Sequence, residues 1–115
     1  MAFQGSCHCG AVKFSVDAAM PTEAMSCNCS ICRRKGTLMA FYPVAKFKLE
    51  GEAALQAYKF NTHRLTHWFC KTCGIHTFGG GIGPDGTEMR AINLRCVPEA
   101  DLDALKIQHF DGASR

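Results

Sequence analysis

The clearest pattern along the chain is an alternation of apolar and polar side chains in residues 10–16. Val12, Phe14 and Val16 fall on one face, and Lys13 lies between them on the other. A repeat of two residues is typical of a β-strand with one buried face. The sequence therefore predicts a half-buried strand directly after the first pair of cysteines.

Similar signals recur along the chain, and none has the spacing of an amphipathic helix. Apolar and β-branched residues between turn signals predict further strands at residues 37–43, 46–50, 54–60, 64–70 and 88–97. Residues 61–63 are turn-like, the glycine-rich residues 78–86 predict a mobile loop between strands, and the chain after Pro98 predicts a short helical turn at most. With no repeat and no linker, residues 1–115 are expected to form one mainly β domain of mostly antiparallel strands.

Eight cysteines in 115 residues change this picture, because so many thiols in a short chain indicate either disulfides or metal sites. The N-terminus lacks the basic and apolar segments of a secretory signal, and no apolar run reaches the ~18 residues of a membrane span. We therefore expect a cytoplasmic protein whose thiols bind metal. The net charge of +3 is small, and metal-bound thiolates would cancel it, so it gives no argument for nucleic-acid binding.

Two cysteine pairs that lie far apart in sequence match the four ligands of a closed structural zinc site. Cys7 and Cys9 form one pair, and Cys70 and Cys73 form the other. Zinc bound in this way contributes on the order of 10 kcal/mol to folding. We expect it to substitute for part of the core that a small β domain lacks.

A third group of cysteines is local, because Cys27, Cys29 and Cys32 all lie in residues 27–32. Three protein ligands with one open position are typical of a catalytic zinc. The eighth cysteine, Cys96, would close this site if it bound there as well. However, it alternates in step with the apolar residues before it, and we favour a place for it in the apolar core.

Histidines and basic residues are further candidates for this site. His63, His67 and His76 lie near the second cysteine pair, although a single histidine is more often structural than a metal ligand. The basic residues 33–35 directly follow the three local cysteines. They form either a solvated patch or a group that offsets thiolate charge and holds an anionic substrate, and the sequence leaves both interpretations open.

The motifs taken together resemble one known family. "CHCGAVKF", "CNCSICRRKG" and "HWFCKTCGIHTF" occur in this order, followed by "INLRC" and "HFDG", and they cover nearly the whole chain. This order resembles that of the glutathione-dependent formaldehyde-activating enzymes, also called the GFA domain. The resemblance implies a β-tent fold of stacked antiparallel sheets, with a structural zinc on Cys7, Cys9, Cys70 and Cys73 and a catalytic zinc on Cys27, Cys29 and Cys32.

The activity that the resemblance implies is that of a carbon-sulfur lyase class, which combines glutathione with formaldehyde to give S-hydroxymethylglutathione. Zinc at the open site would lower the pKa of the glutathione thiol or polarise the aldehyde oxygen. We expect Arg33, Arg34 or Arg64 to bind the glutathione carboxylates. His67 or His76 would move the proton between the thiol and the new hydroxyl group.

Two alternatives stay open at this point. Related β-tent proteins, such as centromere protein V and the Rab-exchange-factor-like zinc proteins, are associated with partner binding, although this chain lacks a long basic tail. The second alternative is a lyase or hydrolase that acts on another thiol adduct or small electrophile at the same open zinc. Exposed strand edges would also allow a homodimer.

Overall fold

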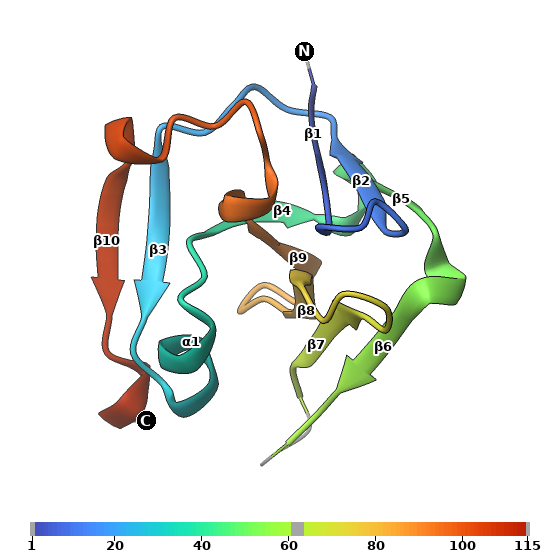
Figure 1. Cartoon of the computed structure of the whole chain (residues 1–115). Coiled ribbons are helices and arrows are strands. Elements are labelled where there is room, and N and C mark those ends of the chain that lie inside the picture. The colour runs from blue at the N-terminus through green and yellow to red at the C-terminus, as the bar shows by residue number, and fades with distance from the viewer. Residues whose placement is uncertain (1, 61–63, 115) are drawn as a thin grey trace.

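The computed structural model describes residues 2–60 and 64–114, and within these ranges the chain is mainly β, with two sheets and one short α-helix. The small sheet has the order β1(Phe3–Ser6), β2(Lys13–Val16), β5(Phe47–Glu50). The large sheet has the order β10(Lys106–Phe110), β3(Glu23–Cys27), β4(Met39–Pro43), β9(Glu88–Asn93), β8(His76–Ile82), β7(Thr66–Cys70), β6(Leu55–Tyr58). The helix α1(Ser30–Lys35) lies beside β3 (Figure 1).

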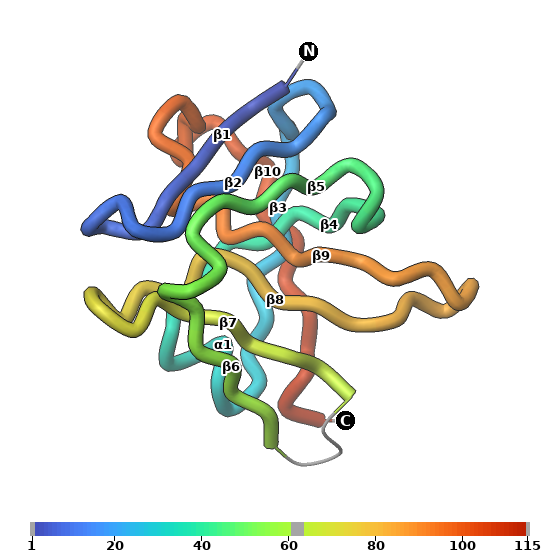
Figure 2. Tube along the Cα trace, turned by 90° about the vertical axis from the view of Figure 1, so that its right-hand side faces the viewer, coloured from blue at the N-terminus to red at the C-terminus, as the bar shows by residue number. Residues whose placement is uncertain are grey.

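Short 3₁₀ turns connect several of these strands. They are η1(Val44–Lys46), η2(Glu52–Ala54), η3(Leu94–Cys96), η4(Leu102–Ala104) and η5(Gly112–Ser114). Neighbouring strands pair antiparallel throughout, except that β10 pairs parallel with β3. In Figure 2 the strands of the small sheet lie side by side above β6, β7 and β8. None of the described helices is long and apolar enough to cross a bilayer.

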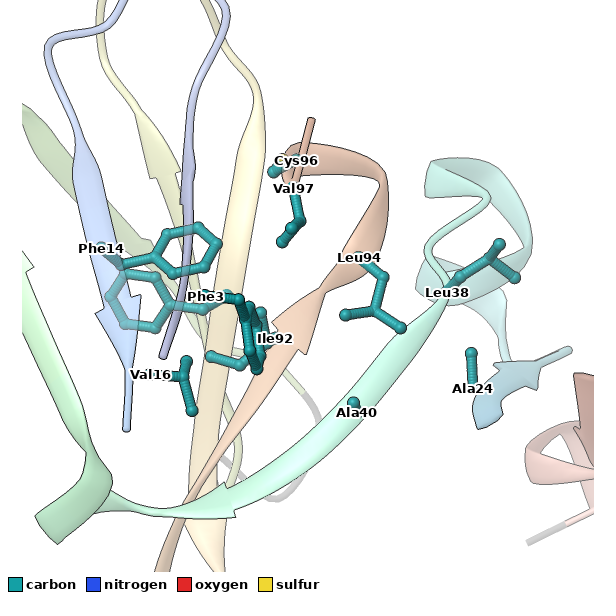
Figure 3. Close-up of a cluster of buried hydrophobic side chains, with 11 residues drawn as sticks. Phe3, Phe14, Val16, Ala24, Leu38, Ala40, Ile92, Leu94, Cys96 and Val97 are labelled. Carbon is teal, nitrogen blue, oxygen red and sulfur yellow. The ribbon is translucent and has the colours of Figure 1, made fainter. Parts of the chain in front are cut away.

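The main core fills the space between the two sheets. Phe3, Phe14 and Val16 of the small sheet lie beside Ile92 of β9, and all four side chains are at most 3% exposed (Figure 3). Phe78 of β8 completes this layer. The alternation predicted around Phe14 and Val16 is therefore confirmed, although the strand itself begins only at Lys13.

The predicted strands at 37–43, 46–50, 54–60 and 64–70 correspond to β4, β5, β6 and β7, each shorter than expected at one or both ends. The predicted turn at 61–63 and His63 lie outside the described residues. The sequence did not predict β1, β3, α1 or β10. These elements are short, and β10 follows a stretch in which Pro98 and several acidic residues obscure any periodicity.

The glycine-rich segment was predicted wrongly as a mobile loop. Residues 79–82 continue β8, which pairs with β7 on one side and β9 on the other, and only residues 83–87 form a turn. The missing side chains have a packing role here, because a Cβ on Gly80 would lie 2.7 Å from the ring of Trp68 and one on Gly81 would lie 2.6 Å from Leu65. Neighbouring side chains therefore occupy the space above these glycines.

The predicted strand at 88–97 is wrong in its second half. β9 ends at Asn93, whose side chain accepts a hydrogen bond from the backbone N–H of Arg95 (3.2 Å) and thereby begins the turn η3. Leu94 and Cys96 are buried all the same, at 0% and 9% exposed. The expectation that Cys96 lies in the core is confirmed, and the thiol donates to the backbone oxygen of His76 (3.6 Å).

Candidate functional site

Four cysteines from two distant turns meet at one end of the molecule. Cys7 and Cys9 lie in the turn between β1 and β2. Cys70 is the last residue of β7, and Cys73 lies in the turn between β7 and β8; the two turns are neighbours in Figures 1 and 2. The Sγ atoms of Cys7 and Cys9 are 3.6 Å apart, and those of Cys9 and Cys70 are 3.7 Å apart. Tetrahedral zinc with Zn–S bonds of ~2.3 Å needs about 3.8 Å between sulfurs. The four thiols therefore fit a zinc ion.

The local sequence explains the shape of both turns. A glycine follows the second cysteine of each pair, and both Gly10 (φ +82°) and Gly74 (φ +79°) adopt the left-handed conformation that glycine accepts without strain. The backbone N–H groups of Val12 and Thr72 point at the sulfurs of Cys7 and Cys70, each at 3.4 Å. Backbone hydrogen bonds in the second turn lower the pKa of Cys70 and so favour its thiolate, the form that binds metal.

The three local cysteines form a second cluster at the end of β3. Cys27 is the last residue of this strand, Cys29 precedes α1, and Cys32 lies within the helix. Their Sγ atoms all lie within 4.8 Å of one another. Among the described residues, no fourth histidine, cysteine or carboxylate joins this group, and Cys96 belongs to neither cluster. The donor set fits a metal with a position left for another ligand.

A segment from the far end of the chain covers this cluster. Because β10 pairs with β3 in a register that places Phe110 opposite Cys27, residues 111–114 turn next to Cys27 and Cys29. Asn28 fastens this turn, since its Nδ2 donates to Asp111 (3.1 Å) and its Oδ1 accepts from the N–H of Ala113 (2.9 Å). Gly112 fits closely, and a Cβ there would lie 2.6 Å from Sγ of Cys27.

Lys35 and two histidines form a polar group near the thiols. The Nζ atom of Lys35 lies 3.1 Å from Nδ1 of His67 and 3.1 Å from Nδ1 of His76. An ammonium group only donates, so both Nδ1 atoms accept and the proton of each neutral ring lies on Nε2. The structure thus brings together the two predicted histidines, and it adds a lysine that the sequence indicated only as part of a basic run.

Burial controls the protonation of this group. It lowers the pKa of Lys35 to about 8, although the charges of Cys32 and Cys29 oppose the shift. Burial and, secondarily, the charge of Lys35 lower the pKa of His67 to about 4 and that of His76 to about 3. At neutral pH both imidazoles are therefore neutral, while Lys35 is mostly protonated and loses its proton just above neutrality.

A cavity of about 470 Å³ opens beside the three thiols, and we call it the apolar cleft. Cys27, Cys29 and Cys32 line it, as do Lys35 and His67. Most of the remaining wall is hydrophobic, and includes Met25, Met39, Phe41, Ile82, Met89 and Phe110. The three thiols thus face an apolar cavity that also holds a proton donor.

Other predicted residues lie outside this cavity. Arg33 and Arg34 are exposed on α1, where Nη1 of Arg34 donates to the backbone oxygen of Ser30 (2.8 Å), and Arg64 is exposed before β7. None of the three lines the apolar cleft, and their binding of glutathione stays a prediction.

Two residues at the site had no signal in the sequence. Thr37 lines the cleft, and its Oγ1 has no hydrogen-bond partner among the described residues although the side chain is only 4% exposed. Asn93 donates to the backbone oxygen of His76 (2.9 Å) and thereby fixes the strand that carries this histidine. Both are small polar residues next to apolar neighbours, which single-sequence patterns do not distinguish from ordinary strand residues.

Comparisons with known proteins show the same fold and the family. A crystal structure of a Rhodobacter sphaeroides protein superimposes with a TM-score of 0.80 at 31% identity, covering 93% of this chain and 99% of that one. A curated protein of Halomonas elongata, described as a putative glutathione-dependent formaldehyde-activating enzyme, is 53% identical over 34 residues. That match covers 30% of this chain and 22% of the relative. The family model of the glutathione-dependent formaldehyde-activating enzyme (GFA) matches residues 2–107, and the chain therefore belongs to the GFA family.

Proposed function

We propose that this protein is a zinc-dependent enzyme of carbon-sulfur lyase type, which joins a thiol such as glutathione to formaldehyde or another small aldehyde, or cleaves the adduct. The observation that carries the proposal is the cluster of three thiols facing a cavity that Lys35 also lines. The family description supports glutathione and formaldehyde as reactants. Free thiols in both clusters suit a reducing compartment, so we also propose a cytoplasmic location.

Cys27, Cys29 and Cys32 would hold the catalytic metal, and Cys7, Cys9, Cys70 and Cys73 a structural one. Zinc at the three-thiol cluster would supply a Lewis acid that makes a substrate thiolate available near neutral pH.

In the reaction the substrate sulfur attacks the carbonyl carbon, so that a C–S bond forms and the C=O π electrons move to oxygen. Lys35 is placed to protonate this oxygen, because its pKa of about 8 keeps it charged at neutral pH but allows it to give up the proton. The proton that the thiol released then restores Lys35. His67 and His76 hold Nζ in place through their Nδ1 atoms. One of the two histidines would also move the proton between the thiol and the new hydroxyl group. Arg33, Arg34 and Arg64 remain candidate ligands for the glutathione carboxylates.

The first test is the number of zinc ions per chain, measured after purification under reducing conditions for the native chain and for Cys29→Ser. We expect two ions that fall to one, with an unchanged circular dichroism spectrum. Adduct formation from glutathione and formaldehyde, followed by NMR, should then be present in the native chain and absent in Cys29→Ser.

A single ion that Cys29→Ser leaves unchanged would contradict the proposal. It would favour a zinc-stabilised binding module without catalysis, because the three local thiols would then hold no metal. Replacement of each proposed arginine and histidine by alanine would separate glutathione affinity from turnover and show which of them contribute.

A further inference from the structure

The large sheet has two apolar faces, and only one of them is covered by the small sheet. Along β4, Ala40 is 9% exposed in the main core, whereas the next residue, Phe41, points to the other face and is 45% exposed. Leu65, Ile82 and Phe110 are likewise 58%, 65% and 38% exposed, and all of them line the apolar cleft. Large exposed apolar groups that gather in one place indicate a binding surface.

One row of residues across four strands explains why this face is hollow. Phe41 of β4 pairs with Ala91 of β9, Ala91 pairs with Gly79 of β8, and Gly79 pairs with His67 of β7. Of the two middle positions, Ala91 carries only a methyl group and Gly79 has no side chain. The outer positions carry the phenyl ring of Phe41 and the imidazole of His67. These small residues leave space over β8 and β9, between an apolar wall and the group formed by Lys35, His67 and His76.

The distribution of charge in the cleft argues against a strongly anionic occupant. Apart from the three thiols, Lys35 is the one lining residue with a formal charge among those that the structure describes, and it is already held by the two histidines. The lining lacks arginine, whereas a glutathione molecule lying inside would bring two carboxylates. Apolar cavities of this size with a few polar groups at one end are typical sites for small organic ligands.

We infer that the aldehyde used at this site carries an apolar chain, which lies in the cleft along Phe41 and Ala91 while its carbonyl group faces the three thiols and Lys35. This rests on the proposed function and names its substrate class. The step is the addition described above: the thiol R–SH and the aldehyde R′–CHO give R–S–CH(OH)–R′, with one C–S bond and one O–H bond formed and no oxidant needed.

The expected preference follows from the burial of the chain. Each methylene group that leaves water strengthens binding by about fourfold, so the three additional methylenes of hexanal should raise kcat/KM by roughly 60-fold over propanal, whose carbonyl group has the same intrinsic reactivity. The methionines of the cleft wall, Met25, Met39 and Met89, are flexible enough to adapt to chains of different shape.

The test compares hexanal with propanal as substrates of the zinc-loaded chain and measures formaldehyde alongside, with glutathione as the common thiol and adduct formation followed by NMR. Ala91→Phe fills the floor of the cleft, and Ala57→Phe makes the same change at an exposed position of β6 outside it. Phe41→Asp places a charge in the cleft, with Val44→Asp as its exposed control. Binding of unreactive 1-hexanol, measured by saturation-transfer NMR, gives a readout that does not depend on turnover.

We expect the native chain to prefer hexanal and to bind hexanol. Ala91→Phe and Phe41→Asp should lose both properties, whereas the two control variants should keep them. Equal use of the two aldehydes would overturn the inference while leaving the proposed function intact. No turnover of either aldehyde or of formaldehyde would overturn the proposed function, and hexanol binding that survives Ala91→Phe would overturn the inference whatever the turnover. Dimerisation that Phe41→Asp abolishes would also overturn it, because a second copy would then occupy the cleft.

Discussion

Replacement of Cys70 by serine should strongly destabilise the protein, because the four-thiol cluster joins the two sheets where little else does. The buried apolar side chains at this end are few: Val12 is fully buried, and Leu49 and Leu55 are only partly so. Full burial of one aliphatic side chain is worth about 1.5–3 kcal/mol, whereas metal binding contributes on the order of 10 kcal/mol. A domain of this size has a total stability of about 5–15 kcal/mol, so a metal bound by the four thiols would dominate it.

The assay is thermal unfolding by circular dichroism together with the metal content of each variant. If Cys70→Ser removes even half of the metal contribution, about 5 kcal/mol, Tm falls by roughly 20 °C. Cys29→Ser is the matched control, because it removes a thiol from the cluster in residues 27–32, which does not join distant parts of the chain. We expect its Tm to change by about 5 °C at most. The reasoning is refuted if Cys70→Ser melts within a few degrees of the native protein after losing its metal.

Three further predictions follow from the site. Lys35→Met should lower the rate of adduct formation at pH 7 by about 10²-fold or more. In the native protein we expect this rate to decline above pH 8, where Lys35 loses its proton, and the decline should be absent from the pH-rate profile of Lys35→Met. The pKa of His67 is about 4 in the folded protein and has its ordinary value of 6.5 in the unfolded chain. Between these two values the unfolded chain binds more protons, so the free energy of unfolding should fall as the pH drops from 6.5 towards 4. Urea unfolding across that pH range should show that the free energy of unfolding falls less steeply for His67→Gln. An unchanged dependence on pH would contradict the lowered pKa of His67. Asn28→Ala removes two hydrogen bonds to residues 111–114 and should cost about 1 kcal/mol, with faster amide exchange in that segment but not in β8.

Periodicity identified most of the strands because one face of each is buried against the other sheet. Val12, Phe14 and Val16 alternate in sequence for the same reason that they are buried in the structure. The cysteine clusters were equally predictable, since ligand spacing within a turn is a local property and only two widely separated pairs were available to complete a four-thiol site.

The cleft could not be predicted, because it depends on which residues become neighbours across strands. Phe41, Ala91, Gly79 and His67 are unremarkable in sequence, and only the register of four strands places them in one row. Lys35 follows two exposed arginines, and nothing local distinguishes a lysine that turns inward. The glycines of β8 were misinterpreted because a sequence pattern shows missing side chains but not the neighbours that occupy their space.

The pairing of Cys9 with Cys70 across 61 residues also determines the order in which the protein is assembled during synthesis. At 5–20 residues per second, the ribosome needs roughly 3–12 s to add the residues between them. Throughout this interval the thiols of Cys7 and Cys9 lack their partners, and no metal can yet join the two pairs. A newly made chain therefore carries two unpartnered thiols for several seconds before the four-thiol cluster can form.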